Sequence, residues 1–111
     1  MNFNEYQKEA LRTEQGMNKD LPRVLNGVLG LGGESGECED IVKKHFWHGH
    51  PLDREHLAKE LGDVLWYIAI TADCIGFDLQ VIADMNVKKL QARYPNGFEA
   101  DKSMNRAAGD V

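Results

Sequence analysis

Residues 29–40, LGLGGESGECED, place four acidic side chains and four glycines in a chain whose apolar residues are spaced as in helices. Each glycine inside a helix costs about 1 kcal/mol relative to alanine, and like charges on neighbouring turns weaken the helix further. A helix with a purely structural role has no reason to carry both. We therefore interpret this stretch as part of a helix that forms one side of a functional site.

Helical periodicity of apolar residues recurs four times, and no strand-like alternation of useful length is present. We expect Asp20 to cap the second helix with Pro22 in its first turn, and the turn HGHPLD at 48–53 to separate it from the third. The sequence thus predicts an all-α fold, a four-helix bundle. The expected helices cover about residues 3–15, 20–48, 53–75 and 78–93.

The composition indicates a single domain with no obvious nucleic-acid or membrane partner. The 111 residues suffice for one domain. We expect it over residues 1–98, followed by a polar tail, 99–111, that is partly disordered or exchanged with a neighbouring subunit. A net charge of −5 gives no electrostatic reason to bind nucleic acid. Neither a secretory signal nor an apolar run of about 18 residues is visible, so we expect a cytoplasmic protein.

Two pairs of acidic residues stand at helical spacing, Glu34 with Glu37 and Glu60 with Asp63. Residues three apart share a helix face. From Glu37 the chain climbs roughly 16 Å to the turn and then descends about 10 Å to Glu60, at 1.5 Å per residue. Antiparallel packing of the two helices therefore sets the two pairs at about the same level.

Four carboxylates in a partly buried cleft repel one another unless a cation lies between them. Such oxygen ligands suit Mg²⁺ or Mn²⁺, particularly beside a phosphate. Gly36 and Gly62, inside the pairs, are expected to leave room for metal, water or a neighbouring helix. Glu39 and Asp40 are expected to be solvated surface charges. The alternative is that both pairs are solvated faces, since an isolated ExxE usually is.

Three blocks of the sequence, GLGGESGE at 30–37, KELGDVLWYI at 59–68 and NVKKLQARYPNGF at 86–98, resemble the MazG-like, all-α nucleoside triphosphate pyrophosphohydrolases. The family's ExxE–spacer–ExxD signature reads here as the two acid pairs with 22 residues between them. The similarity extends from YQKEALRT near the start to Phe98. The short length resembles the single-domain, often phage-type members.

The resemblance implies hydrolysis of a (deoxy)nucleoside triphosphate to the monophosphate and pyrophosphate, as in housecleaning of nucleotide pools. In this family the motif acids bind Mg²⁺ ions that clamp the phosphates and activate a water for attack on the α-phosphorus. By position, Glu37, with Glu34 beside it, is the candidate for orienting that water. The metal ligands carried over by position are Glu34, Glu37, Glu60 and Asp63.

Further candidate contacts to the substrate lie outside the acid pairs. Asn86, Lys89 and Arg93 form a polar stripe on the fourth helix, which is either a solvated face or, as the family block implies, a phosphate or nucleotide contact. Lys44 shares the acid face and is a candidate phosphate ligand. Trp47 could stack on a base at a pocket rim, although plain packing or solvent exposure is the simpler interpretation.

Other interpretations of the sequence remain open. The histidines of HFWHGH, at 45, 48 and 50, suggest zinc, but no fourth ligand is obvious. A ferritin-like di-metal bundle would need two Glu-x-x-His motifs, and Asp53-x-x-His56 is the nearest match. A non-enzymatic helical interaction module with an acidic surface is the main alternative. The second and third helices carry apolar residues on more faces than this chain can cover, which favours a homodimer or homotetramer.

Overall fold

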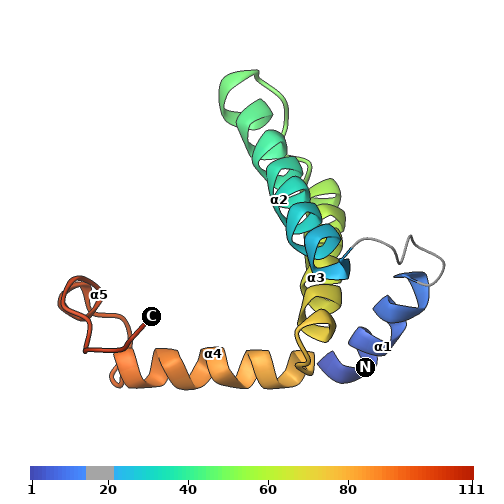
Figure 1. Cartoon of the computed structure of the whole chain (residues 1–111). Coiled ribbons are helices and arrows are strands. Elements are labelled where there is room, and N and C mark those ends of the chain that lie inside the picture. The colour runs from blue at the N-terminus through green and yellow to red at the C-terminus, as the bar shows by residue number, and fades with distance from the viewer. Residues whose placement is uncertain (15–21) are drawn as a thin grey trace. The chain divides into compact units, whose positions relative to one another are not determined.

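A computed structural model of the chain describes residues 1–14 and 22–111 (Figure 1). The described residues form helices and no named strand, with only an isolated bridge between Pro95 and Gly97. The all-α prediction is therefore confirmed, with five helices in place of the four expected. The helices are α1 (Phe3–Glu14), α2 (Arg23–Trp47), α3 (Arg54–Cys74), α4 (Leu79–Arg93) and α5 (Ala100–Met104).

The predicted helix ends agree with the structure to within a few residues. Asp53 caps α3, because its carboxylate accepts a hydrogen bond of 3.0 Å from the backbone N–H of His56. Pro22 occupies the N-cap position of α2 and makes no side-chain cap bond. Asp20, the expected cap of this helix, lies outside the described residues. The periodicity did not predict α5, which is too short to carry a repeating apolar face.

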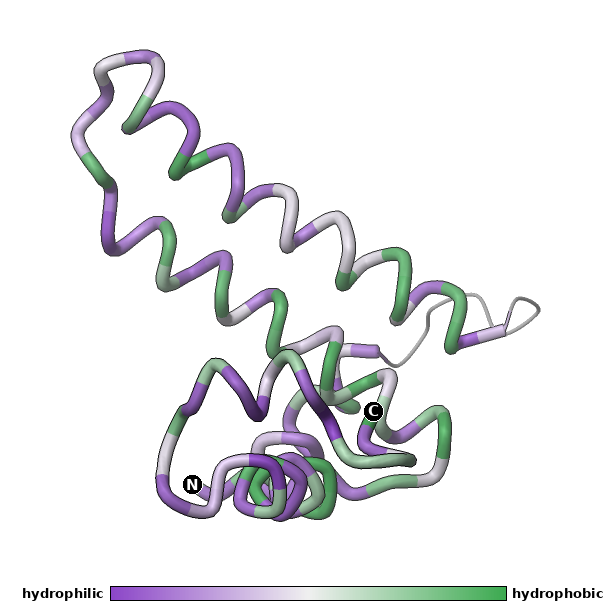
Figure 2. Tube along the Cα trace, turned by 90° about the vertical axis from the view of Figure 1, so that its left-hand side faces the viewer, coloured by the Kyte–Doolittle hydropathy of each residue, from purple (hydrophilic) through white to green (hydrophobic). Residues whose placement is uncertain are grey.

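The chain divides into two compact units, Met1–Leu79 and Gln80–Val111, and each is described here by itself. In the first unit, α2 and α3 run antiparallel as a long hairpin, and α1 packs against α3 (Figures 1 and 2). The fully buried core lies where α1 meets the C-terminal half of α3. Its members are Ala10, Ala69, Ile70 and Leu79, with Tyr6, Leu11, Leu65, Trp66, Ile68 and Cys74 packed around them.

A buried glutamine fastens α1 to the end of α3. Gln7, 5% exposed, donates from Nε2 to the carbonyl oxygens of Ala69 (3.2 Å) and Phe77 (3.1 Å). Its Oε1 accepts a hydrogen bond of 3.0 Å from the backbone N–H of Leu79. One side chain therefore bonds to the Ala69 carbonyl within α3 and to two backbone groups of the turn after α3, so its own buried polar atoms have partners.

Two glycines let α2 and α3 approach closely. A Cβ at Gly27 would overlap the Thr71 hydroxyl and stand 3.3 Å from the Thr71 Cβ, and a Cβ at Gly30 would overlap the Tyr67 ring. Gly36 and Gly62, by contrast, have no atom within 4 Å of such a position. Within the described chain the close approach of the two helices therefore falls to Gly27 and Gly30, and the expectation that Gly36 and Gly62 leave room for metal or water stays a prediction.

The second unit contains α4, α5 and the segment after them. The Tyr94 and Phe98 rings contact each other at 5.2 Å between centroids. The Arg93 guanidinium pairs with the Asp110 carboxylate through two hydrogen bonds, so the tail at 99–111 is attached to α4. Exchange of this tail with a neighbouring subunit stays a prediction.

No single helix among the described residues is long and apolar enough to span a membrane. Only α3 and α4 taken together, across the break between them, reach that length and apolarity.

Candidate active site

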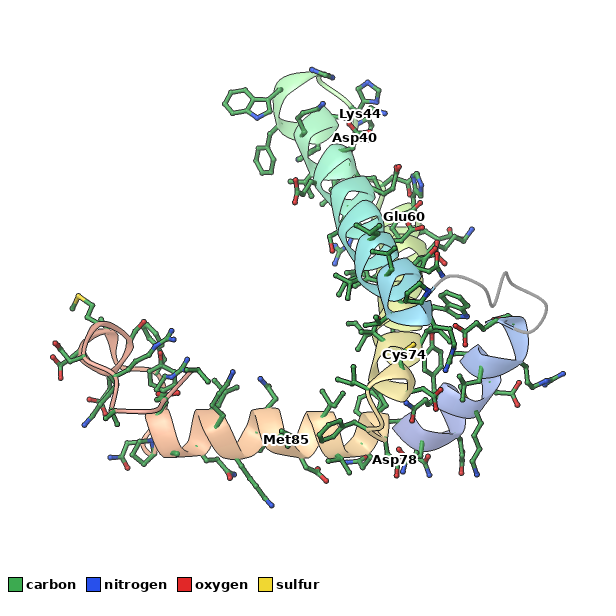
Figure 3. The ribbon with its side chains drawn as sticks, in the orientation of Figure 1. Asp40, Lys44, Glu60, Cys74, Asp78 and Met85 are labelled. Carbon is green, nitrogen blue, oxygen red and sulfur yellow. The ribbon has the colours of Figure 1, made fainter. Side chains whose placement is uncertain are left out.

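Three carboxylates of the two predicted acid pairs converge on the α2–α3 hairpin. Glu34 comes from α2, and Glu60 and Asp63 come from one face of α3. One oxygen of each lies within 4.8 Å of the others. Figure 3 shows Glu60 partway along the hairpin, between its turn and the core. The prediction that antiparallel packing sets the two acidic stretches at one level is therefore confirmed for these three residues.

The backbone approach described above explains how the carboxylates meet. Gly30 precedes Glu34 by about one helical turn, and it brings α2 against Tyr67, which follows Asp63 by one turn on α3. Because Gly30 has no side chain, the two helix backbones lie close together here, and acidic residues at facing positions come within reach of one ion. Gly30, near the start of LGLGGESGECED, thus contributes to the site through helix packing, whereas Gly32 and Gly33 have no atom within 4 Å of an added Cβ.

The three carboxylates lie close enough to repel one another electrostatically. Glu34 and Glu60 are half-buried, and the Glu60 side chain is 17% exposed. The pKa of Glu34 is raised above its usual 4.5, first by partial desolvation, then by a hydrogen bond with Glu60 and by the negative charges of Asp63, Glu60 and Glu37. A cation placed among these oxygens would relieve this repulsion, so the donor set and its electrostatics fit a divalent metal ion.

Glu37 lies outside this converging set. It is exposed on α2, one turn beyond Glu34, and its charge contributes to the raised pKa of Glu34. The structure therefore brings together three of the four expected metal ligands. A role of Glu37 as a ligand or as the group that orients water stays a prediction.

His56 contacts the site although sequence reasoning did not assign it there. Its Nε2 lies 3.0 Å from Oε1 of Glu60, one turn further along α3. A ligating carboxylate that also contacts a second side chain is held in one orientation, which commonly strengthens metal binding. The i, i+4 spacing of His56 and Glu60 was the signal that could have predicted this contact.

Lys44 and Asp40 pair with each other on α2, nearer the hairpin turn than Glu60 (Figure 3). Lys44 Nζ lies 2.9 Å from Asp40 Oδ2, and Lys43 Nζ lies 3.3 Å from Asp40 Oδ1. These two lysines hold the pKa of Asp40 below its usual value. Asp40 is therefore a surface charge, as expected, that is paired with these two lysines, and a phosphate bound by Lys44 would have to compete with it.

Trp47 and the histidines lie around the turn of the hairpin. Trp47 is 80% exposed, so it is not a packing residue of the described chain. His45 Nδ1 lies 2.9 Å from the backbone carbonyl oxygen of His50. In residues 1–14 and 22–111 the histidines form no metal-binding cluster, so the zinc interpretation gains no support.

The expected substrate contacts of α4 belong to the second unit. Asn86 and Lys89 are exposed. The Arg93 side chain is 9% exposed and its guanidinium is held by Asp110, so this face of α4 is only partly solvated. The polar stripe that the spacing predicted is present, and its last member already has an anionic partner within the chain.

Comparison with known proteins identifies the family. The MazG nucleotide pyrophosphohydrolase domain matches residues 25–98, a range that includes both acid pairs and the polar stripe of α4. The chain belongs to this family. It is 35% identical over 83 residues to the Gene 37 protein of Mycobacterium phage L5, a match that covers 71% of this chain and 73% of the relative. No solved structure matches.

The family match confirms the resemblance drawn from the three sequence blocks and covers the middle of the chain, residues 25–98. The MazG domain contains almost all of α2 and the whole of α3 and α4. Helices α1 and α5 and the segment to Val111 lie outside it. Membership in this family makes the chain a nucleotide pyrophosphohydrolase in its general class.

Proposed function

We propose that the chain hydrolyses (deoxy)nucleoside triphosphates to the monophosphate and pyrophosphate with Mg²⁺, for which Mn²⁺ is the natural substitute. The observation that carries this proposal is the convergence of Glu34, Glu60 and Asp63 within 4.8 Å. Carboxylates from two helices, partly buried and mutually repelling, are a site for a hard divalent cation. When bound there, Mg²⁺ supplies charge neutralisation for the triphosphate and lowers the pKa of a bound water.

The side chains around the acids have distinct tasks in this proposal. Glu34, Glu60 and Asp63 hold the metal, and His56 keeps the Glu60 carboxylate in one orientation. Glu37, exposed one turn along α2, is assigned in this proposal the task of orienting the attacking water or taking its proton.

Substrate contacts are proposed for the cationic and amide side chains of the family block. Lys89 and Arg93 bind phosphate oxygens, and Asn86 bonds to phosphate, sugar or base. Trp47, with 80% of its surface exposed, offers a face on which a base can stack, and Lys44 adds positive charge near the hairpin turn. Arg93 must exchange its Asp110 partner for a phosphate in order to take part.

The exposed apolar surface of the hairpin supports assembly of two or four copies. Leu25, Val28 and Leu29 lie three and four residues apart on α2 and are 50%, 52% and 66% exposed. Leu61 on α3 is 54% exposed. An apolar stripe of this kind is normally covered in a stable protein. We therefore propose a homodimer or homotetramer that works in the cytoplasm, where housecleaning of the nucleotide pool would take place.

A panel of ribo- and deoxyribonucleoside triphosphates with Mg²⁺ tests the proposal. The expected products are pyrophosphate and the monophosphate, and the Glu60→Gln variant should lose the activity. Glu39→Gln is the matched control, since Glu39 is an exposed acid of α2 outside the converging set. Release of inorganic phosphate with a diphosphate would indicate another hydrolase. No turnover and no thermal shift with Mg²⁺ would favour the interaction module.

A further inference from the structure

The second unit contains a pocket of which only some lining residues lie within the matched MazG domain. It has a volume of about 580 Å³ and lies between the C-terminal half of α4 and residues 102–111. Its α4 wall includes Lys89 and Arg93, and its other wall includes Lys102, Arg106 and Asp110. The family match ends at residue 98, so the second wall is a feature of this chain outside the matched domain.

Positive charge dominates this pocket although the whole chain carries a net charge of −5. Four cationic side chains and one acidic side chain line it. Arg93 pairs with Asp110, and in the described residues no ion pair joins Lys89, Lys102 or Arg106 to a carboxylate. The pocket therefore has more positive charge than Asp110 neutralises.

Asp110 holds Arg93 in the manner of a bound anion. Arg93 Nε donates to Oδ2 at 2.8 Å and Nη2 donates to Oδ1 at 2.7 Å. The two side chains are 9% and 16% exposed. A guanidinium binds two oxygens of a phosphate with the same paired geometry. The carboxylate thus occupies a position that a phosphate group could take.

The surroundings of Asp110 favour negative charge at that position. The pKa of Asp110 is lowered, first by its hydrogen bonds with Arg93 and then by the positive charges of Arg93, Arg106 and Lys89. Charges from both walls therefore act on one point. Asp110 reaches it through a tight turn, in which its N–H donates to the Ala107 carbonyl at 3.1 Å. Gly109 supplies the positive φ of 84° that the turn needs.

We propose that this pocket binds phosphate-bearing anions and that Asp110 is a built-in competitor, which occupies Arg93 until a ligand phosphate displaces it. The inference rests on the proposed function in taking a phosphate as the ligand and in assigning Lys89 and Arg93 to its oxygens. Displacement frees the Ala107–Val111 segment and leaves Lys102 and Arg106 to contact the anion. When a site is closed by its own chain, its apparent Kd rises by the reciprocal of the open fraction, about tenfold if the segment is open about one-tenth of the time.

The first experiment measures binding of inorganic pyrophosphate by titration calorimetry, with the full chain in buffer containing a chelator, so that metal at the acidic site plays no part. Asp110→Asn should bind pyrophosphate at least threefold more tightly than the wild type, because the competing charge is gone. Asp101→Asn is the control: Asp101 lies in α5, accepts a hydrogen bond from Asn105 and does not line the pocket. Equal affinity of Asp110→Asn and the wild type would overturn the proposal.

A second pair of variants tests the pocket wall that contains Lys102 and Arg106. Lys102→Ala combined with Arg106→Ala should weaken pyrophosphate binding at least fivefold, whereas Lys88→Ala on the exposed surface of α4 should leave it unchanged. The Arg93 Nε–H resonance in NMR spectra should move when pyrophosphate is added to the wild type. An unmoved Arg93 signal at saturation would show that the anion binds elsewhere and would overturn the competition.

The outcomes separate this inference from the proposed function. Release of pyrophosphate from triphosphates by the wild type, together with unchanged binding in Asp110→Asn, would retain the hydrolase and reject the competitor. Tighter binding in Asp110→Asn without hydrolysis of any triphosphate would retain the anion pocket and reject the hydrolase.

Discussion

Gly30 of α2 faces the ring of Tyr67 on α3 so closely that no side chain fits between them. This approach brings the two helices together beside Glu34 and Asp63, which lie one turn away on their respective helices. The packing of the hairpin and the geometry of the acidic site therefore depend on the same glycine.

Replacing Gly30 with alanine should destabilise the protein by about 1–3 kcal/mol, because the added methyl group forces the Tyr67 ring or the helix to shift. Gly32→Ala is the matched control on the same helix, where nothing lies within 4 Å of the new Cβ. The control should be neutral or up to about 1 kcal/mol more stable, as helix propensity predicts. Urea unfolding followed by circular dichroism measures both, and equal stability of the two variants would contradict the close approach.

Gln7→Ala should cost about 2–4 kcal/mol of stability. The substitution leaves the Phe77 carbonyl and the Leu79 N–H in the turn after α3 without this partner and removes a second acceptor bond from the Ala69 carbonyl within α3. Each unsatisfied buried group is unfavourable. Gln91→Ala, at an exposed position of α4, should change stability by less than about 0.5 kcal/mol. Thermal unfolding of the two variants gives the comparison, and a Gln7→Ala protein as stable as the wild type would refute the anchoring role.

Glu37→Gln and Asp63→Asn should each abolish hydrolysis of triphosphates while the helical fold survives. Loss of a like charge relieves repulsion in the metal-free protein, so the unfolding temperature should stay the same or rise. Pyrophosphate release together with circular dichroism measures both effects. Full activity in both variants would refute the acidic site, whereas full activity in Glu37→Gln alone would limit the site to the three converging carboxylates.

The stability of the metal-free protein should depend on pH through Glu34. Its folded-state pKa is raised, so its contribution is fully present below the unfolded pKa and is lost as pH rises through the folded pKa. The stability advantage of Glu34→Gln over the wild type should therefore grow as pH rises from about 4.5 toward neutrality. Melting curves in chelator at several pH values measure it.

Addition of Mg²⁺ provides the control for the Glu34 experiment. Near neutral pH the ion should raise the melting temperature of the wild type, because binding to the folded state stabilises it. Glu34→Gln should show a smaller rise. A pH-independent difference between the two proteins in chelator would argue against the raised pKa as its cause.

Local sequence patterns were sufficient to predict most of the helices and the two acid pairs of the candidate site. The apolar periodicity predicted four of the five helices within a few residues, because burying one face of a helix requires that spacing. The acid pairs were recognisable since residues three apart share a face. The turn at 48–53 placed them at one level. Helix α5 was missed because five residues cannot show a period.

Only the tertiary structure decided which side chains meet. Helical spacing leaves open how each helix is rotated about its axis against its neighbour, and this rotation brings Glu34, but not Glu37, to Glu60 and Asp63. The close approach at Gly27 and Gly30 depends likewise on residues some 40 positions away. The sequence by itself determined the helices and their acids. The packing between segments distant in the chain decided the carboxylate set on the hairpin and, within the second unit, the hold of Asp110 on Arg93.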